Sequence, residues 1–414
     1  MLLTALNLYK NAYSGLSKES WYLSLVMFIN RSGTMVLPFM TIYCTQKLNF
    51  TIVQAGVIMG LFGAGSIAGA FIGGKITDKL GFHYLQVGAL FSGGIMFLTL
   101  SFLETFLSLG VGVFLLSMCN DSFRPANSTA VAYYSTDKNR TRSYSLNRLA
   151  INLGWSFGGA LGGFIASHDY KFLFYVDGCT NILAALLLLY LLPAVKPEKE
   201  PETTEQKPVI KSAYRDKMYL AFILLTALFA SCFFQFFTMQ PVFFKTQWHF
   251  TEQFIGILMA MNGLIIVFSE MVLIHKLEGK KQPLYFICLG VIMVGLGFLL
   301  FNIFQPAIWV AILSMLLLTL GEMFSMPFMN TYWISRTTKN NRGEYAGLFT
   351  ISWAVAQILA PVYGSIIIQH GGYTSLWYLI FAIAMVVSIG FYAMYKIEQN
   401  VESMPKSFRK LIGL

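Results

Sequence analysis

Four charged residues stand out in this chain because each lies inside a long run of apolar residues. Asp121 and Arg124 are three positions apart, so they lie on one face of a helix and can form an ion pair. Pro125 follows them and can loosen the helix backbone at that point. Arg31 and Glu322 lie in two other apolar runs, and Glu322 has no basic residue within one helical turn. Acids and bases in such surroundings can bind protons or hold charged ligands.

The composition places these charges in a lipid bilayer. Hydrophobic residues make up 56% of the chain and charged residues 12%, whereas roughly a quarter of the residues of a soluble domain are charged. A helix needs about 20 apolar residues to cross the ~30 Å hydrocarbon core. Twelve such runs are present, near residues 20–45, 53–74, 83–103, 106–132, 143–167, 172–192, 218–243, 252–274, 283–303, 307–329, 345–369 and 373–395.

The distribution of basic residues predicts the orientation of these runs. Of 29 Lys and Arg, 23 lie in the termini and the even-numbered loops, three in odd-numbered loops and three inside the runs. Basic loops stay on the cytoplasmic side. We therefore expect a multi-pass protein of the cell (inner) membrane with both termini cytoplasmic. The net charge of +10 then lines the inner face of the membrane, and nucleic-acid binding is not expected.

The two halves of the chain repeat each other in the same order. An offset of 202 carries Pro125 onto Pro327, and an offset of 200 carries Phe50 and Thr51 onto Phe250 and Thr251. Parallel repeats of this kind are common in secondary transporters.

The repeat predicts an all-α membrane protein with twelve transmembrane helices in two six-helix bundles related by a parallel pseudo-repeat. The N-terminal bundle is expected at residues 1–192 and the C-terminal bundle at residues 218–414. Residues 193–217 contain four prolines among mixed charges, which is typical of a flexible cytoplasmic linker.

Charges at this depth are costly and therefore informative. A charge at the centre of a membrane helix costs roughly 2.5–3.5 kcal/mol, so Arg31, beside Asn30, is expected to face a cavity or a partner. Desolvation favours the neutral form of a carboxylate, so Glu322 is expected to bind and release a proton near physiological pH. The alternatives are structural. Arg31 or Glu322 would then only hold neighbouring helices, and Asp121 and Arg124 would only neutralise each other.

The loop after the second run contains a family motif. Residues 74–83 read GKITDKLGFH, which resembles the motif between helices two and three of the major facilitator superfamily. Gly74, Asp78 and Gly81 match, and Lys79 keeps the charge of the family's arginine, whereas other residues replace its final basic pair. The resemblance implies that Asp78 caps a neighbouring helix and stabilises the outward-facing state. A surface loop of mixed charge is the alternative.

The fifth run carries a second motif. Residues 151–163 read INLGWSFGGALGG and contain Gly158, Gly159, Gly162 and Gly163. This segment resembles the motif of drug/proton antiporters in the same superfamily, which ends Gly-Pro-x-x-Gly-Gly, with Gly159 in place of the proline.

Proton-coupled oligopeptide transporters are also similar in places. They have an Ile-Asn-Leu-Gly segment in the fifth helix, an arginine in the first, which Arg31 resembles, and a basic residue before a proline in the fourth, which Arg124 resembles. Their Glu-x-x-Glu-Arg signature is absent, because Met27 and Asn30 occupy the positions of its two glutamates. The proton site of that group is therefore not carried over.

The family resemblance implies two bundles that rock about a central site lined by helices one, four, seven and ten. We therefore expect a secondary transporter that couples protons to a small organic solute. Glu322 is the first candidate for proton binding and Asp121 the second. Arg31, Arg124 and Asn30, with Gln235 from the aromatic-rich seventh run, are the candidates for substrate binding.

Two kinds of substrate remain open. The fifth-run motif and the aromatic seventh run favour drug-type efflux. Two arginines and one glutamate in the site would suit uptake of peptides or other carboxylates. The expected partners are the solute, protons and the bilayer, with the protein acting as a monomer.

Other classes of protein fit less well. No Ser/His/Asp arrangement and no metal-ligand spacing occurs among the five histidines and five cysteines, so neither an enzyme nor a cofactor is expected. A facilitator without protons, or a signalling or lipid-moving protein on the same fold, stays possible. Asp177, in the sixth run, is expected to be a partly hydrated carboxylate near the outer surface.

Overall fold

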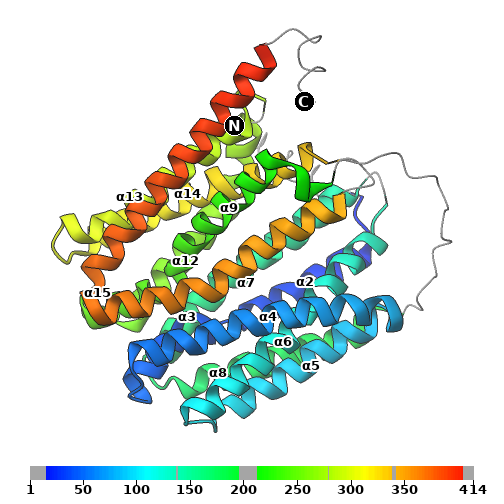
Figure 1. The fold of residues 1–414 in the computed structure, drawn as a ribbon. Coiled ribbons are helices and arrows are strands. Elements are labelled where there is room, and N and C mark those ends of the chain that lie inside the picture. Colours follow the sequence, from blue (N-terminus) through cyan, green and yellow to red (C-terminus); the bar gives the residue numbers. More distant parts are fainter. Residues whose placement is uncertain (1–14, 137–138, 195–211, 278, 338–341, 404–414) are drawn as a thin grey trace, which may run out of the picture. The chain divides into compact units, whose positions relative to one another are not determined.

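The computed structural model describes residues 15–136, 139–194, 212–277, 279–337 and 342–403, and all its regular elements are helical. Figure 1 shows their arrangement along the chain. They are α2 (Lys18–Ser32), α3 (Val36–Ile42), the π-helical turn η1 (Tyr43–Lys47), α4 (Ile52–Leu80), α5 (Phe82–Leu100), α6 (Phe106–Tyr133), α7 (Arg140–Ala166), α8 (Lys171–Leu191), the short turn η2 (Ala213–Arg215), α9 (Lys217–Phe233), α10 (Gln235–Thr238), α11 (Gln240–Thr246), α12 (Glu252–Leu277), α13 (Pro283–Ile303), α14 (Ile308–Ser335) and α15 (Arg342–Ser403).

Eleven helices among the described residues are long and apolar enough to cross a membrane. The last, α15, has 62 residues, and its backbone turns at Gly372, where φ is 70° and ψ is 178°. The predicted runs 345–369 and 373–395 lie on either side of this glycine. The sharp bend is visible where the ribbon changes from orange to red (Figure 1). The predicted twelve crossings therefore correspond to eleven spanning segments, because the last two crossings are joined in α15.

Short polar side chains determine where several helices begin. Ser17, Thr51 and Thr105 accept hydrogen bonds from backbone N–H groups three residues later, each at 3.2 Å. Asp216 does the same for the Tyr219 N–H at 3.1 Å. A helix start leaves such N–H groups without intrahelical partners. These caps begin α2, α4, α6 and α9 in turn.

Packing divides the chain into two compact units. Unit 1 consists of Met1–Glu202, Phe237–Val267 and Pro361–Ile366. Unit 2 consists of Thr203–Phe236, Phe268–Ala360 and Ile367–Leu414. The two predicted bundles were defined from the sequence repeat and not from packing. Their boundaries at residues 192 and 218 therefore stay a prediction.

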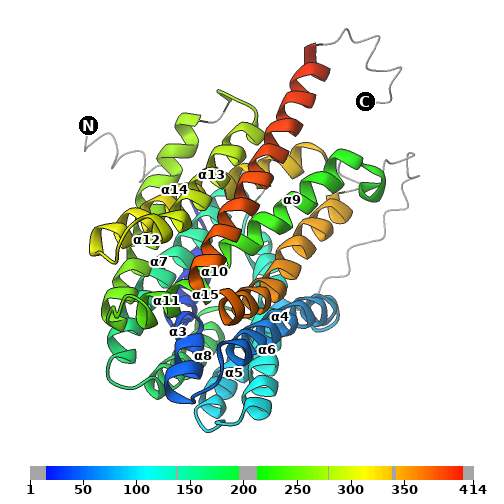
Figure 2. The same ribbon diagram turned by 60° about the vertical axis from the view of Figure 1, so that its left-hand side comes forward.

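Glycines allow the helices of each unit to approach closely. In unit 1, α4 lies beside α6 (Figures 1 and 2), and a Cβ at Gly73 would lie 2.7 Å from the Ser122 Cα. In unit 2, α13 lies beside α14, where a Cβ at Gly290 would lie 2.8 Å from the Ser325 nitrogen. Small residues permit this close packing in membranes, and it determines the positions of the charged residues on α6 and α14.

The internal repeat extends to the geometry of single turns. Asn49 and His249, 200 positions apart, both have φ of 54°, which is uncommon for residues other than glycine. The next residue in each case, Phe50 or Phe250, donates its N–H to the carbonyl six residues earlier at 2.9 Å. Both turns connect the first and second spanning segments of their half, so the predicted parallel repeat is confirmed at the backbone level.

Candidate functional site

Asp121 and Arg124 form the predicted ion pair on α6, with 2.5 Å between Arg124 Nε and Asp121 Oδ1. The Asp121 side chain is 5% exposed and that of Arg124 is 58% exposed. Ser117, one turn earlier, donates its hydroxyl to the Phe62 carbonyl of α4 at 2.6 Å, and its Oγ lies 3.4 Å from Asp121 Oδ2. The acid is therefore buried, whereas its basic partner extends out of the packed region.

Arg31 lies in the last turn of α2 and packs against α7. A Cβ at Gly154 of α7 would lie 2.5 Å from the Arg31 Cβ, so only glycine permits this approach. The Arg31 guanidinium also interacts electrostatically with Asp121 and Arg124 of α6. Three of the four predicted charges are thus part of one electrostatic group within unit 1.

Asn30, the predicted polar neighbour of Arg31, belongs to a buried chain of hydrogen bonds. Its Nδ2 donates to Asn181 Oδ1 at 2.9 Å, and Asn181 Nδ2 donates to the Asp177 carbonyl at 2.8 Å. This chain connects α2 to α8 directly beside Arg31. Whether Asn30 also contacts a solute stays a prediction.

The expectation for Asp177 is wrong. Its side chain is 0% exposed and accepts the backbone N–H groups of Met35 at 3.1 Å and Val36 at 2.8 Å. The first spanning segment breaks between α2 and α3, so the start of α3 has free N–H groups and a partial positive charge. A carboxylate satisfies both. Gly33, at the break, was the available sequence signal.

Unit 2 contains the other two candidates. Glu322 is half-buried on α14, immediately after Gly321, which packs closely against α13. Gln235 is fully buried, and its Nε2 donates to the Ala360 carbonyl at 2.7 Å. An aromatic cluster borders Gln235, with Trp353 6.0 Å from the Phe234 ring. The proposed roles of Glu322 and Gln235 in binding stay predictions.

The loop motif contributes a defined turn. Gly81 ends α4 with φ of 84° and donates its N–H to the Thr77 carbonyl at 2.9 Å. A Cβ at Gly74 would meet no atom within 4 Å. The side chains of Asp78 and Lys79 lie outside the described part of the chain, so the implied capping role of Asp78 stays a prediction.

The fifth-run glycines divide between two faces of α7. A Cβ at Gly158 would lie 3.0 Å from the Ser32 carbonyl oxygen, and one at Gly162 would lie 3.0 Å from the Met35 Cβ. On the other face, a Cβ at Gly159 would lie 3.0 Å from the Met259 Cβ, and one at Gly163 would lie 2.9 Å from the Gly256 Cα. The motif therefore packs α7 against the broken first segment and, within the same unit, against α12.

Polar contacts reinforce this packing at one end of α12. Glu252, the first residue of α12, accepts a hydrogen bond from the Tyr170 hydroxyl at 2.5 Å. Lys245 Nζ lies 2.7 Å from Glu252 Oε1. These three side chains connect the α7–α8 loop, α11 and α12 within unit 1.

A charged cluster in unit 2 was missed by the sequence reasoning. Arg336, at the end of α14, lies 2.9 Å from Asp216 Oδ2 and 2.9 Å from Glu398 Oε1. Tyr345 donates its hydroxyl to Asp216 at 3.0 Å. Burial opposes ionisation, but the Tyr219 N–H and the Arg336 guanidinium together hold the pKa of Asp216 below its usual value. The cluster thus joins the start of α9, the end of α14 and both ends of α15.

No group of three or more His, Cys, Asp or Glu residues in the described ranges could hold a metal ion.

Comparison with known proteins identifies the family. The Major Facilitator Superfamily model matches residues 23–361. YqjV of Bacillus subtilis, an uncharacterized MFS-type transporter, is 23% identical over 371 residues, which cover 85% of this chain and 87% of YqjV. The multidrug resistance protein MdtH of Aeromonas hydrophila is 22% identical over 356 residues, covering 83% of this chain and 86% of MdtH.

A solved structure of a POT family transporter in complex with 5-aminolevulinic acid has the same fold. Its TM-score is 0.80 at 15% identity, covering 93% of this chain and 97% of that chain. The family model extends from α2 into α15, through nearly all the helices described above. The chain therefore belongs to the Major Facilitator Superfamily and is a multi-pass membrane transporter rather than an enzyme.

Proposed function

We propose that this transporter exports drug-like organic molecules in exchange for protons, by alternating access, as a monomer in the cell (inner) membrane with both termini cytoplasmic. The observation that supports proton coupling best is the Asp121–Arg124 pair, a buried carboxylate within a spanning helix whose partner is 58% exposed. Relatives named as multidrug resistance proteins support efflux.

Glu322 is the proposed principal proton carrier and Asp121 the second. Asp121 forms an ion pair with Arg124 on α6, and Glu322 is half-buried on the spanning helix α14. A proton on Asp121 would remove the charge that holds Arg124. The Arg124 side chain could then move, or bind an anionic group together with Arg31.

Coupling follows if protons and solute bias the same conformational equilibrium. We propose that the close contact of α7 with α12 at Gly159 and Gly163, within unit 1, changes when the protein passes from one conformation to the other. The loop residues Gly74, Asp78, Lys79 and Gly81 and the α7 glycines Gly158 and Gly162 are proposed to take part in the same transition.

Proton flux in energised inside-out vesicles, followed with a pH-quenched dye, tests this function. Addition of a lipophilic cation should restore the dye signal in the native protein, and Glu322→Gln should abolish the response. Asp121→Asn should reduce it. An unchanged response in Glu322→Gln would exclude this residue as the carrier, and silence with every cation tested would exclude cation efflux.

Uptake of peptides or other carboxylates is the second candidate. The electrostatic group of Arg31, Arg124 and Asp121 supports it, because two guanidinium groups can bind a carboxylate. The test is dipeptide uptake into liposomes under an inward proton gradient. Arg31→Gln and Arg124→Gln should each raise the KM for the dipeptide, and no uptake by the native protein would reject this candidate.

A further inference from the structure

A groove of about 310 Å³ lies between α13 and the last part of α15, within unit 2. Its walls include Leu289 and Ile292 from α13 and Ile389 from α15. Cys288 and Ser388 also line it, but their Sγ and Oγ atoms lie 3.0 Å apart and hydrogen-bond to each other. The groove therefore presents an apolar surface along most of its length.

The groove is open on the side that would face the bilayer. Ile389 is 69% exposed and Tyr392, at one end of the groove, is 46% exposed. Both α13 and α15 are long and apolar enough to span the membrane. A lipid chain could therefore enter from the side, without any opening of the helix bundle.

Two lysines stand at the end of the groove where α13 begins. Lys281 Nζ lies 5.8 Å from the centre of the Tyr285 ring, and Lys396 Nζ lies 5.7 Å from the centres of both the Tyr392 and Tyr395 rings. The Tyr285 and Tyr395 rings are 5.9 Å apart. One group of three aromatic rings thus holds two ammonium groups, as cation–π contacts favour.

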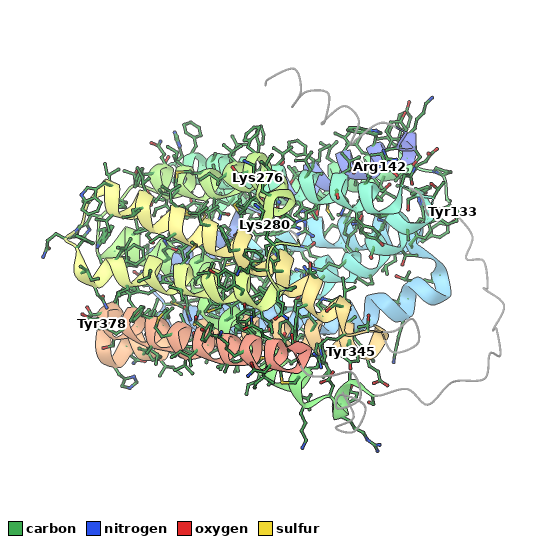
Figure 3. All side chains as sticks on the ribbon, turned by 90° about the horizontal axis from the view of Figure 1, so that it is seen from above. Tyr133, Arg142, Lys276, Lys280, Tyr345 and Tyr378 are labelled. Carbon is green, nitrogen blue, oxygen red and sulfur yellow. The ribbon has the colours of Figure 1, made fainter. Side chains whose placement is uncertain are left out.

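The two ammonium groups are available to an external anion. Among the residues that the structure describes, neither forms an ion pair with a carboxylate, and Lys396 Nζ donates to Gln399 Oε1 at 3.3 Å. Further positive charge is supplied by Lys276, near the end of α12, and by Lys280, in the loop before α13, both labelled in Figure 3. Tyrosines and lysines are typical of the headgroup level of a membrane.

We propose that this groove binds an anionic phospholipid, with an acyl chain along Leu289, Ile292 and Ile389 and the phosphate between Lys281 and Lys396. The apolar part of the groove matches the acyl chain of such a lipid, and the two lysines at its end match the negatively charged headgroup. Basic pockets between spanning helices are suited to anionic headgroups. This proposal does not depend on the proposed transport function, because the groove contains none of the residues proposed for it.

Native mass spectrometry of the full-length protein in detergent tests the proposal. The probes are phosphatidylglycerol and phosphatidylcholine with identical acyl chains. The native protein should bind phosphatidylglycerol more tightly, and Lys281→Gln with Lys396→Gln should weaken that binding roughly 10–30-fold. Equal binding of the two lipids, or no effect of the double variant, would overturn the proposal.

Control variants separate charge from packing. Lys47→Gln with Lys75→Gln removes two exposed lysines from unit 1, one of which also lies over an aromatic ring, at 4.3 Å from Phe71. This control should bind phosphatidylglycerol as the native protein does. Leu289→Trp should fill the groove and weaken the binding of both phosphatidylglycerol and phosphatidylcholine. Ile389→Trp, at an exposed position, provides the same test if Leu289→Trp does not fold.

Two further results would assign the groove to a different occupant. Competition by inorganic phosphate alone would show a simple anion site that needs no acyl chain. A dimer mass that replaces the lipid-bound mass would assign this face to a second copy of the chain. Either result would overturn the proposal.

Discussion

The buried carboxylates of this protein differ in the group that binds each of them. Asp177 accepts hydrogen bonds from the backbone N–H groups of Met35 and Val36, which cannot move without the helix. Asp121 forms an ion pair with a side chain that is itself 58% exposed. A partner on the backbone suits a permanent structural role, whereas a partner on a long, exposed side chain can be exchanged. Asp121 is therefore suited to switching and Asp177 is not.

Replacement of Asp177 by Asn should destabilise the protein without moving its transport pH profile. The amide has one acceptor oxygen instead of two, so one N–H at the start of α3 would lose its partner at a cost of about 1–3 kcal/mol. Thermal unfolding in detergent measures this loss. Glu104→Gln, which removes an exposed ion pair with Lys171, is the control and should leave the unfolding temperature unchanged. A shifted pH profile in Asp177→Asn would contradict the structural role.

At the scale of elements, the contacts of α7 explain why its motif consists of glycines. One face packs against the broken first segment through Gly158 and Gly162, and the other packs against α12 through Gly159 and Gly163. A helix with two close neighbours has no room for side chains on either face. The motif therefore serves packing on both sides of one helix.

Replacement of Gly163 by Val should separate α7 from α12. The new side chain would collide with the Glu252 carbonyl and the Gly256 backbone, and overpacking of this kind costs typically about 1–3 kcal/mol. We expect a lower unfolding temperature and a loss of transport. Gly88→Ala is the control, because a Cβ there meets no atom within 4 Å. Normal transport by Gly163→Val would show that this contact is dispensable.

The Asp216 cluster, which joins the ends of α9, α14 and α15, should make the stability of the protein depend on pH. The folded state holds the pKa of Asp216 below its usual value, which is about 3.9 in an unfolded chain. The stabilisation is therefore fully present above about pH 4, and it is lost as the pH falls through the lower folded value. Asp216→Asn should unfold at a lower temperature than the native protein at pH 6.

The difference between Asp216→Asn and the native protein should shrink on acidification below about pH 4, where Asp216 of the unfolded chain binds a proton, and it should vanish below the lower folded pKa, where Asp216 is neutral in both states. Unfolding temperatures of the two proteins, measured at each pH, provide the comparison. A difference that stays constant down to pH 3 would show that the Asp216 charge contributes nothing to the cluster.

At the scale of the whole molecule, the sequence was most informative about features that repeat or that depend on hydropathy. The spanning segments and the Asp121–Arg124 pair follow from local spacing, and the parallel repeat follows from a constant offset of about 200 positions; the structure bears them out. Figure 2 shows the result as a set of long helices with short connections.

Long-range partners could not be predicted in the same way. Asp177 and Val36 are 141 positions apart, and Asp216 and Arg336 are 120 apart. No periodicity connects residues at these separations, and only the packing of the helices brings them together. The break at Gly33 indicates that a helix start needs a hydrogen-bond acceptor, and Asp216 before α9 indicates a carboxylate that can bind a base. Neither sign identifies the residue that fills the role.

The predicted orientation can be tested with single cysteines in a variant that lacks the five native ones. A cysteine at Glu104, in the loop between α5 and α6, should react with a membrane-impermeant maleimide in intact cells. A cysteine at Lys280, in the loop between α12 and α13, should react only in inside-out vesicles. The reverse pattern would place both termini outside the cell.

The partnership between Asp177 and α3 also has a consequence for biosynthesis. At roughly 5–20 residues per second, the ribosome delivers Asp177 roughly 7–28 s after Val36, since 141 positions separate them. During that interval the first segment enters the membrane without the carboxylate that satisfies its broken turn. We expect it to insert as a continuous helix, or to remain beside the insertion machinery, until the sixth segment emerges. The first helix of this transporter therefore acquires its final shape only after more than two fifths of the chain has been made.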